Sequence, residues 1–247
     1  MTGGICSLVE AHTLRFRTLE NPPLEYHQKG LVVGLAADLI REAVKRTGHT
    51  AQIKIRPWKR VLLEVSQGMA DAAFNAGRSA EREEWGLFSE EMLVEERYVL
   101  FSKQHLNLPA DLSGIENLVL GKQLGYFYGE RFMQVLAESR FKNVQTKLTI
   151  TQCLELLMAE RTDVFVGDWM PTLYYLRKME ASDHVFPVRQ RGSDEPLVVS
   201  VSPTFVVFSR KTVTPEYVRE FDRALRAMKA DGTYAAIVRS YGYQVLP

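Results

Sequence analysis

In the first third of the chain, segments whose hydrophobic residues recur at every second position alternate with segments in which they recur at every third or fourth position. Residues 14–19 and 51–55 alternate between apolar and polar side chains, and residues 70–74 are mostly apolar, which predicts three short strands. Between them, residues 35–44 and 58–65 carry apolar side chains three and four positions apart, which predicts two helices. Strand, helix, strand, helix, strand in this order predicts a parallel α/β sheet. Ligands of such sheets bind on the loops that follow the strands.

A second α/β pattern begins after residue 114. Residues 98–102, 118–120, 163–166 and 205–208 predict further strands. Thr149 and Gln152 have the spacing of a capping box at the start of a helix. Four apolar residues spaced 3, 4 and 3 apart predict a last helix, and Gly232 is expected to end it: Val218, Phe221, Leu225 and Met228. We expect two α/β lobes, with the C-terminal helix left over.

The composition excludes several classes of protein. The 247 residues include 31 Lys and Arg against 30 Asp and Glu, a net charge of +1, so we expect no nucleic-acid partner. Two cysteines cannot build a disulfide-rich scaffold or a four-Cys zinc site. No apolar run reaches the roughly 20 residues that span a bilayer. With no Gly-rich phosphate loop, metal-ligand cluster or nucleophile motif in the sequence, we expect no cofactor, no metal and no catalytic residues.

The first eleven residues leave two interpretations open. Val9-Glu10-Ala11 ends in a small residue and is followed at once by the first predicted strand. Residues 1–11 are therefore the remnant of a secretory leader whose basic and apolar parts lie upstream, or an ordinary N-terminus.

Six short motifs follow one another along nearly the whole chain. They are Pro22-Pro23-Leu24-Glu25-Tyr26, the Gly-x-x-x-Gly-x-x-x-Asp of residues 30–38, Gly68 to Ala72, Ser79 to Arg82 with Phe88-Ser89 beyond, Arg161 to Asp168, and Ala230 to Tyr234 with Tyr241. In this order they resemble the motifs of the periplasmic solute-binding proteins of the polar amino-acid uptake family. The resemblance extends from Leu14 to Tyr241.

The resemblance implies an α/β, two-lobed type II periplasmic-binding-protein fold, in which each lobe is a mostly parallel sheet flanked by helices. Lobe 1 is expected from residues 12–98 and 208–247, and lobe 2 from 104–202. Residues 99–103 and 203–207 are the expected two-strand hinge. A ligand is expected in the cleft between the lobes, which closes by a hinge motion.

Arg82 and Asp168 are the first candidates for ligand contact. A guanidinium offers a planar fork of donors that matches a carboxylate, and the resemblance assigns Arg82 to the α-carboxylate of an amino acid. Asp168 follows a buried strand, and the resemblance assigns it to the α-amino group. The alternatives are a surface Arg82 paired with a neighbouring glutamate, and an Asp168 that caps a helix.

Eight further residues are candidate ligand contacts: Trp58, Arg78, Asn75, Tyr26, Glu25, Ser79, Tyr126 and Tyr128. Core packing is the alternative for the aromatic residues Trp58, Tyr126 and Tyr128, and helix capping is the alternative for Ser79. Arg78 beside Arg82 favours an additional acidic group on the ligand, unless it is simply solvated. The loop at residues 125–129 carries aromatic residues where relatives often carry hydroxyls, which favours an aromatic, cyclic or larger ligand.

Three functions remain open. The first is a non-enzymatic, periplasmic binding protein, expected as a monomer, that captures an amino acid or a related zwitterion for a membrane permease of the ABC type. The second is an orphan or sensory module that signals to a partner when its ligand binds. The third is an enzyme similar to the cyclohexadienyl dehydratases, which needs a carboxylic acid such as Glu25 or Asp168 to protonate a leaving hydroxyl.

Overall fold

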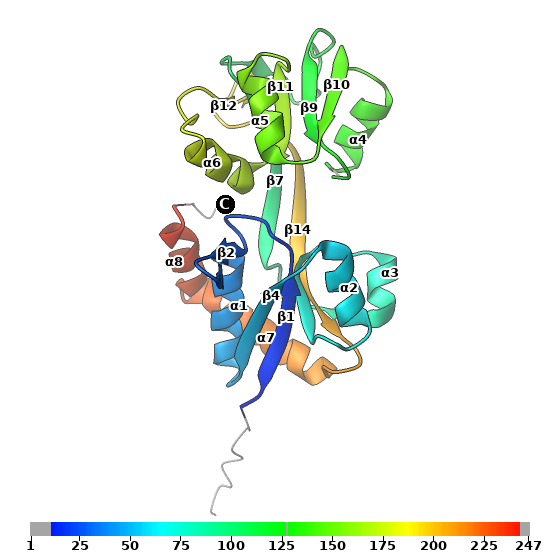
Figure 1. The fold of residues 1–247 in the computed structure, drawn as a ribbon, viewed down its shortest axis with the longest axis vertical. Helices are drawn as coiled ribbons and strands as arrows, with labels where there is room; N and C mark the ends of the chain where they lie inside the picture. The colour runs from blue at the N-terminus through cyan, green and yellow to red at the C-terminus, as the bar shows by residue number, and fades with distance from the viewer. Residues whose placement is uncertain (1–10, 127, 243–247) are drawn as a thin grey trace, which may run out of the picture. The chain divides into compact units, whose positions relative to one another are not determined.

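The structure is a computed structural model that describes residues 11–126 and 128–242. The chain forms two compact units (Figure 1): unit 1 contains the chain up to Val94 and again from Thr204, and unit 2 is Glu95–Pro203. The segment considered as a leader lies, apart from Ala11, outside the described residues. Both boundaries fall inside a strand, since β7 (Val94–Ser102) and β14 (Val198–Ser209) each run from one unit into the other.

Unit 1 is built on a mixed sheet in the order β4-β1-β5-β14-β6. Its other strands are β1 (Thr13–Thr18), β4 (Thr50–Ile55), β5 (Ala72–Ala76) and β6 (Gly86–Phe88), with a separate hairpin of β2 (Tyr26–Gln28) and β3 (Leu31–Val33). Strand β1 is parallel to β4 and β5, whereas β14 is antiparallel to β5 and β6. Its helices are α1 (Leu35–Arg46), α2 (Trp58–Ser66), α3 (Ala80–Trp85), α7 (Pro215–Ala230) and α8 (Thr233–Ser240).

The two faces of the unit 1 sheet bury different side chains because successive residues of a strand point in opposite directions. Val207 of β14 packs with Val61 and Val65 of α2. The next residue, Phe208, points to the opposite face, where its ring meets Phe221 of α7. Helices on both sides therefore cover the sheet, and the loops at its strand ends stay available for function.

Unit 2 has the same kind of construction, with the sheet order β10-β9-β11-β7-β12. Its other strands are β8 (Asn107–Leu108), β9 (Val119–Gln123), β10 (Asn143–Lys147), β11 (Val164–Asp168), β12 (Phe186–Pro187) and β13 (Arg189–Gln190), and its helices are α4 (Glu130–Ala137), α5 (Ile150–Met158) and α6 (Trp169–Lys178). Strand β9 is parallel to β10 and β11, whereas β7 is antiparallel to β11 and β12.

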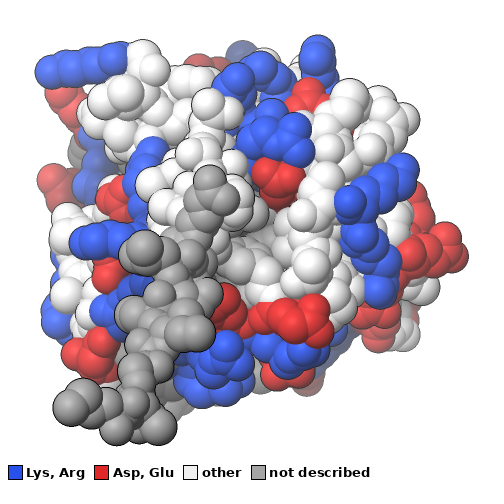
Figure 2. Space-filling model, turned by 90° about the horizontal axis from the view of Figure 1, so that it is seen from below, with Lys and Arg blue, Asp and Glu red and all other residues white. Residues whose placement is uncertain are grey.

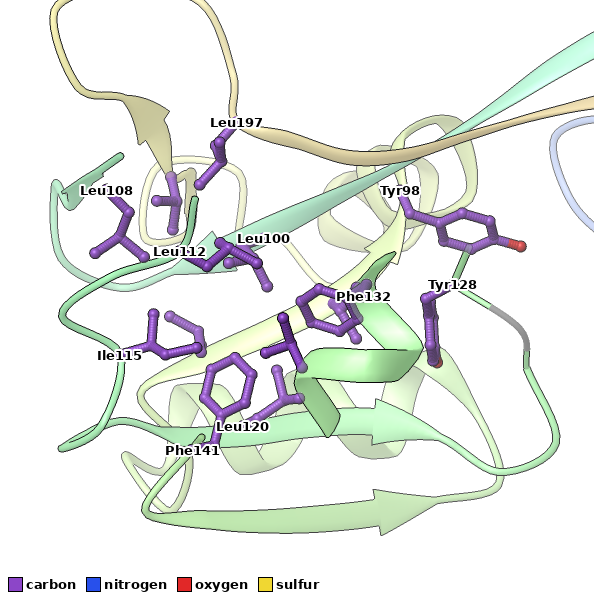
Figure 3. Packing of buried hydrophobic residues seen from close by; sticks show 14 residues of the cluster. Tyr98, Leu100, Leu108, Leu112, Ile115, Leu120, Tyr128, Phe132, Phe141 and Leu197 are labelled. Atoms are coloured by element: carbon purple, nitrogen blue, oxygen red, sulfur yellow. The ribbon is translucent and has the colours of Figure 1, made fainter. Parts of the chain in front are cut away.

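Strand β7 shows the same alternation in unit 2. Tyr98 and Leu100 belong to the cluster that packs against α4, whereas Val99 and Phe101 belong to the cluster that packs against α5 and α6. Figure 3 shows the first cluster, with Tyr98 at one end and its hydroxyl pointing away from the apolar side chains. The core of unit 2 therefore ends in a polar atom at this edge.

The α/β class expected from the sequence is confirmed. The structure differs from the sequence predictions in local details, of which two follow. The strand expected at 70–74 is β5 at Ala72–Ala76, because the amides of Met69 and Ala70 still bond to the Glu64 carbonyl at the end of α2. The capping box is half right: the Thr149 hydroxyl accepts a hydrogen bond from the Gln152 amide at 3.2 Å. The Gln152 side chain instead accepts from the Leu148 amide at 3.1 Å.

One face of the molecule carries charged side chains of both signs (Figure 2). On the face shown in Figure 2, Lys and Arg side chains lie among Asp and Glu side chains and uncharged residues, without a broad patch of one sign. This face offers no extended field to attract a polyanion. No helix among the described residues is long and apolar enough to cross a membrane.

Candidate functional site

Arg82 lies at the end of unit 1 where β5 leads into the short helix α3. The Ser79 hydroxyl accepts a hydrogen bond from the Arg82 amide at 3.3 Å and so caps the helix, as the capping alternative for Ser79 expected. The Arg82 Nη1 donates to the Gly77 carbonyl at 2.7 Å, and the guanidinium carbon lies 5.6 Å from the centre of the Trp58 ring. The structure thus brings three of the candidates together: Trp58, Ser79 and Arg82.

The Arg82 guanidinium is half-buried and has no anionic partner among the described residues. No described Asp or Glu oxygen lies within ion-pair distance of it, and burial lowers its pKa from the usual value, although the negative charge of Glu81 opposes this shift. The expected alternative, an exposed arginine paired with a neighbouring glutamate, is not what the described residues form. A partly desolvated guanidinium in this state favours an added carboxylate.

Glu25 and Asn75 form a second contact in unit 1. Glu25 is fully buried, and its Oε2 accepts a hydrogen bond from the Asn75 side-chain amide. The Thr204 hydroxyl lies 3.2 Å from Asn75 Oδ1 and 2.8 Å from the Val94 carbonyl, so it is within hydrogen-bond distance of both. Asn75 has a positive φ of 56°, which asparagine tolerates better than most residues. These contacts fix the strand end from which the Arg82 loop departs.

Arg78 has surroundings different from those of Arg82. Its Nη2 donates to the Ser89 carbonyl at 2.7 Å, and its guanidinium lies 4.7 Å from the centre of the Phe205 ring. It lines an open hollow of about 360 Å³ whose lining does not include Arg82. Tyr26, the remaining candidate of unit 1, is half-buried on β2 opposite Val33.

Asp168 is the last residue of β11 and precedes α6. It is only 8% exposed, and its Oδ1 accepts a hydrogen bond from the Arg97 amide at 3.2 Å. Burial raises the pKa of Asp168 well above its usual range, and the nearby charge of Glu96 adds to the shift. The backbone amides of Arg97, Trp169 and Met170 oppose it. No described Lys or Arg forms an ion pair with this carboxylate, and although Asp168 occupies the N-cap position of α6, its side chain makes no capping hydrogen bond to that helix.

The two candidate tyrosines of the loop at residues 125–129 differ in burial. Tyr128 is fully buried, and its hydroxyl accepts a hydrogen bond from the Gln123 amide at 2.9 Å, which favours core packing over ligand contact. Tyr126 is 38% exposed, and its ring lies nearly parallel to that of Tyr128 at 6.3 Å. Of the two tyrosines, Tyr126 is therefore the one whose ring is exposed.

Sequence reasoning missed Glu96. Tyr98 donates a hydrogen bond from its hydroxyl to Glu96 Oε2 at 3.1 Å, and burial raises the pKa of Glu96. The negative charges of Glu96 and Asp168 both raise the pKa of Tyr126, after burial itself, so all three belong to one neighbourhood. The available signal was a charged pair, Glu95-Glu96, just upstream of the strand predicted at residues 98–102.

We predict that Asp168→Asn stabilises the solute-free protein at neutral pH. Because the folded state holds the proton of Asp168 more tightly than the unfolded chain, the wild type loses stability as pH rises above about 4, the ordinary carboxyl pKa. Asparagine carries no such charge. Urea unfolding should show a gain on the order of 1 kcal/mol at pH 7 and a much smaller difference near pH 4. If Asp168→Asn instead lost the same unfolding free energy at both pH values, burial of the ionised Asp168 carboxylate would not be destabilising the wild type.

The described residues hold no group of three or more His, Cys, Asp or Glu side chains placed to bind a metal ion. The uncompensated charges among these residues are a guanidinium without an anion in unit 1 and carboxylates without a cation, beside tyrosines, in unit 2.

Comparison with known proteins decides the family. A sequence model of the bacterial extracellular solute-binding proteins, family 3, matches residues 14–244. The chain belongs to this family. The resemblance stated from the six motifs is thereby confirmed, and so is the solute-binding role of the family to which they pointed.

Several proteins are similar to this member of family 3. The L-cystine-binding protein TcyA of Bacillus subtilis (strain 168) is 22% identical over 221 residues, which cover 89% of this chain and 76% of the relative. An ancestral cationic amino acid solute-binding protein has a TM-score of 0.73 at 19% identity, covering 93% of this chain and 95% of its own. A histidine kinase sensor domain with similarity to periplasmic binding proteins has a TM-score of 0.71 at 18% identity, covering 95% and 98%. These likenesses confirm the two-lobed type II fold.

Proposed function

We propose that this protein binds an amino acid outside the cytoplasm and presents it to an ABC-type permease. The observation that carries the proposal is a pair of uncompensated opposite charges. Arg82 of unit 1 is a half-buried guanidinium without an anionic partner among the described residues, and Asp168 of unit 2 is a buried carboxylate without a cationic one. An amino acid carries the complement of both, a carboxylate and an ammonium group.

The two contacts differ in geometry. The fork of N–H donors on Arg82 matches the two oxygens of an α-carboxylate, and stacking on Trp58 together with the bond to Gly77 fixes the plane of the guanidinium. The Asp168 carboxylate already accepts the Arg97 amide and would accept an ammonium group with its remaining lone pairs. Two similar proteins support this ligand class: one is an L-cystine-binding protein and the other a cationic amino acid solute-binding protein.

The first experiment is a calorimetric titration of solute-free protein with the twenty amino acids and L-cystine. Refolding from denaturant removes any solute carried through purification. At least one amino acid is expected to bind with a micromolar or tighter Kd and to raise the Tm, since a solute that binds only the folded state stabilises it. The absence of binding by every amino acid would overturn the proposal. Incubation with prephenate is expected to give no turnover, which separates a binding role from a dehydratase role.

A sensory role is the second candidate, and the likeness to a histidine kinase sensor domain favours it. The same solute would bind in both cases, so binding measurements do not separate the two. Uptake of the radiolabelled solute by cells with and without the gene does: loss of uptake supports transport, and unchanged uptake supports sensing.

A further inference from the structure

We propose that Glu96 selects solutes with a second positively charged group, so that the ligand is an amino acid with a side-chain ammonium or guanidinium. The inference rests on the proposed function, because it takes the α-ammonium group of the amino acid to bind Asp168. It adds a specificity-determining residue that neither the motifs nor the family assignment names.

The register of two strands places Glu96 near Asp168. In the antiparallel pair of β11 and β7, Asp168 lies opposite Tyr98. Tyr98 holds Glu96 Oε2 with its hydroxyl at 3.1 Å, while the amide of the intervening residue, Arg97, bonds to Asp168 Oδ1 at 3.2 Å. Three consecutive residues of β7 thus organise two carboxylates at one edge of unit 2.

Among the described residues, no cationic side chain pairs with the carboxylates of Glu96 and Asp168. The Arg97 side chain turns to Glu95, with 2.5 Å between Nε and Oε1. No Lys or Arg side chain among the described residues forms an ion pair with Glu96 or Asp168. Asp168 is more than nine-tenths buried, and a buried carboxylate without a cation is unfavourable.

One ammonium group cannot balance both charges. A neutral amino acid brings a single cation, which compensates Asp168 and leaves Glu96 either ionised beside it or protonated. An amino acid with a second cation compensates both. A solute with two cationic groups is therefore expected to bind with a more favourable free energy than a neutral amino acid of the same shape.

The surrounding tyrosines fit a cation as well. Tyr98 and Tyr128 meet edge to face with ring centres 5.2 Å apart, and Tyr126 lies nearly parallel to Tyr128. Tyr126 is 38% exposed, so its ring offers a face over which an ammonium or guanidinium can lie. The same ring covers the apolar stem of such a side chain.

The test compares charged amino acids with neutral analogues of nearly the same shape. Arginine is paired with citrulline, and lysine with norleucine, in calorimetric titrations of the wild type, Glu96→Gln and Glu155→Gln. Glu155 is exposed on α5 of the same unit. Glu155→Gln is the control, because it removes one negative charge at a position other than Glu96 and Asp168.

We expect wild type to bind arginine or lysine at least tenfold more tightly than the neutral analogue. Glu96→Gln should weaken the charged ligand about tenfold or more and change the Kd of the neutral one by less than threefold. Glu155→Gln should change neither. Urea unfolding should show that solute-free Glu96→Gln is at least as stable as wild type at pH 7, because burial disfavours the Glu96 carboxylate.

Two results overturn the inference and are distinguishable from each other. If amino acids bind but the charged and neutral analogues have equal Kd values, or if Glu96→Gln weakens both alike, Glu96 is not the selector and the proposed function stands. If no amino acid binds wild type at all, the proposed function falls and the inference falls with it.

Discussion

Arg82→Ala is expected to weaken binding of the amino acid by about 100-fold. Truncating one partner of a desolvated, hydrogen-bonded charge pair costs about 3 kcal/mol, and each 1.4 kcal/mol is roughly tenfold in Kd. The described residues supply no second guanidinium in the same setting, because Arg78 bonds to the Ser89 carbonyl and packs over Phe205. Calorimetric titration with the best amino acid of the panel measures the effect.

Two companion variants make the Arg82 result specific. Arg82→Lys keeps the charge but loses the planar fork, so an intermediate loss of about tenfold is expected. Arg223→Ala removes a guanidinium from an exposed position of α7 in the same unit and should leave the Kd unchanged. An Arg82→Ala protein that is folded by circular dichroism and binds within threefold of wild type would remove Arg82 from the site.

Phe208→Ala is expected to cost about 3–5 kcal/mol of unfolding free energy, a large part of the stability of an ordinary domain. Phe208 is fully buried, and its ring makes edge contacts with Phe16, Tyr217 and Phe221 at centre distances of 6.2, 5.9 and 5.3 Å. The truncated side chain leaves a cavity between β14 and α7 that close-packed neighbours cannot fill. The midpoint and slope of urea unfolding measure the loss.

A matched change at the surface separates this cavity from the general effect of losing apolar bulk. Leu63 on α2 is 50% exposed, and alanine is a better helix former than leucine. Leu63→Ala should therefore cost less than about 1 kcal/mol. If the two variants lost similar free energies, the aromatic contacts of Phe208 would not be the source of the stability assigned to them.

The proposed solute and the stability of the empty protein are linked. Glu96 and Asp168 are disfavoured as carboxylates in the folded state because burial raises the pKa of each. The charges that bind a cationic solute therefore destabilise the solute-free protein, and binding repays that cost. Variants that neutralise either carboxylate are expected to gain stability and lose affinity together, which a purely structural role for these residues would not produce.

The sequence by itself determined the class of fold and the family. Hydrophobic periods of two and of three to four residues are local properties, and they are sufficient to predict β1, α1, α2 and α7 close to their observed bounds. The six motifs, read in order, led to the family that the comparison confirms. They also placed Asp168 directly after a strand, where parallel sheets present ligand-binding groups, and singled out Arg82 within the motif of residues 79–82.

Only the tertiary structure decided which side chains act together. Glu25 and Asn75 are 50 residues apart in sequence, and Arg97 and Asp168 are 71 apart. The register of β7 against β11 sets the second contact, and no local pattern encodes a register between distant strands. Tyr126 and Tyr128 are equivalent candidates in the sequence, yet packing buries only Tyr128. The proposed roles of Arg82, Asp168 and Glu96 rest on burial and on missing charge partners among the described residues, which are properties of the packed chain and not of any segment of it.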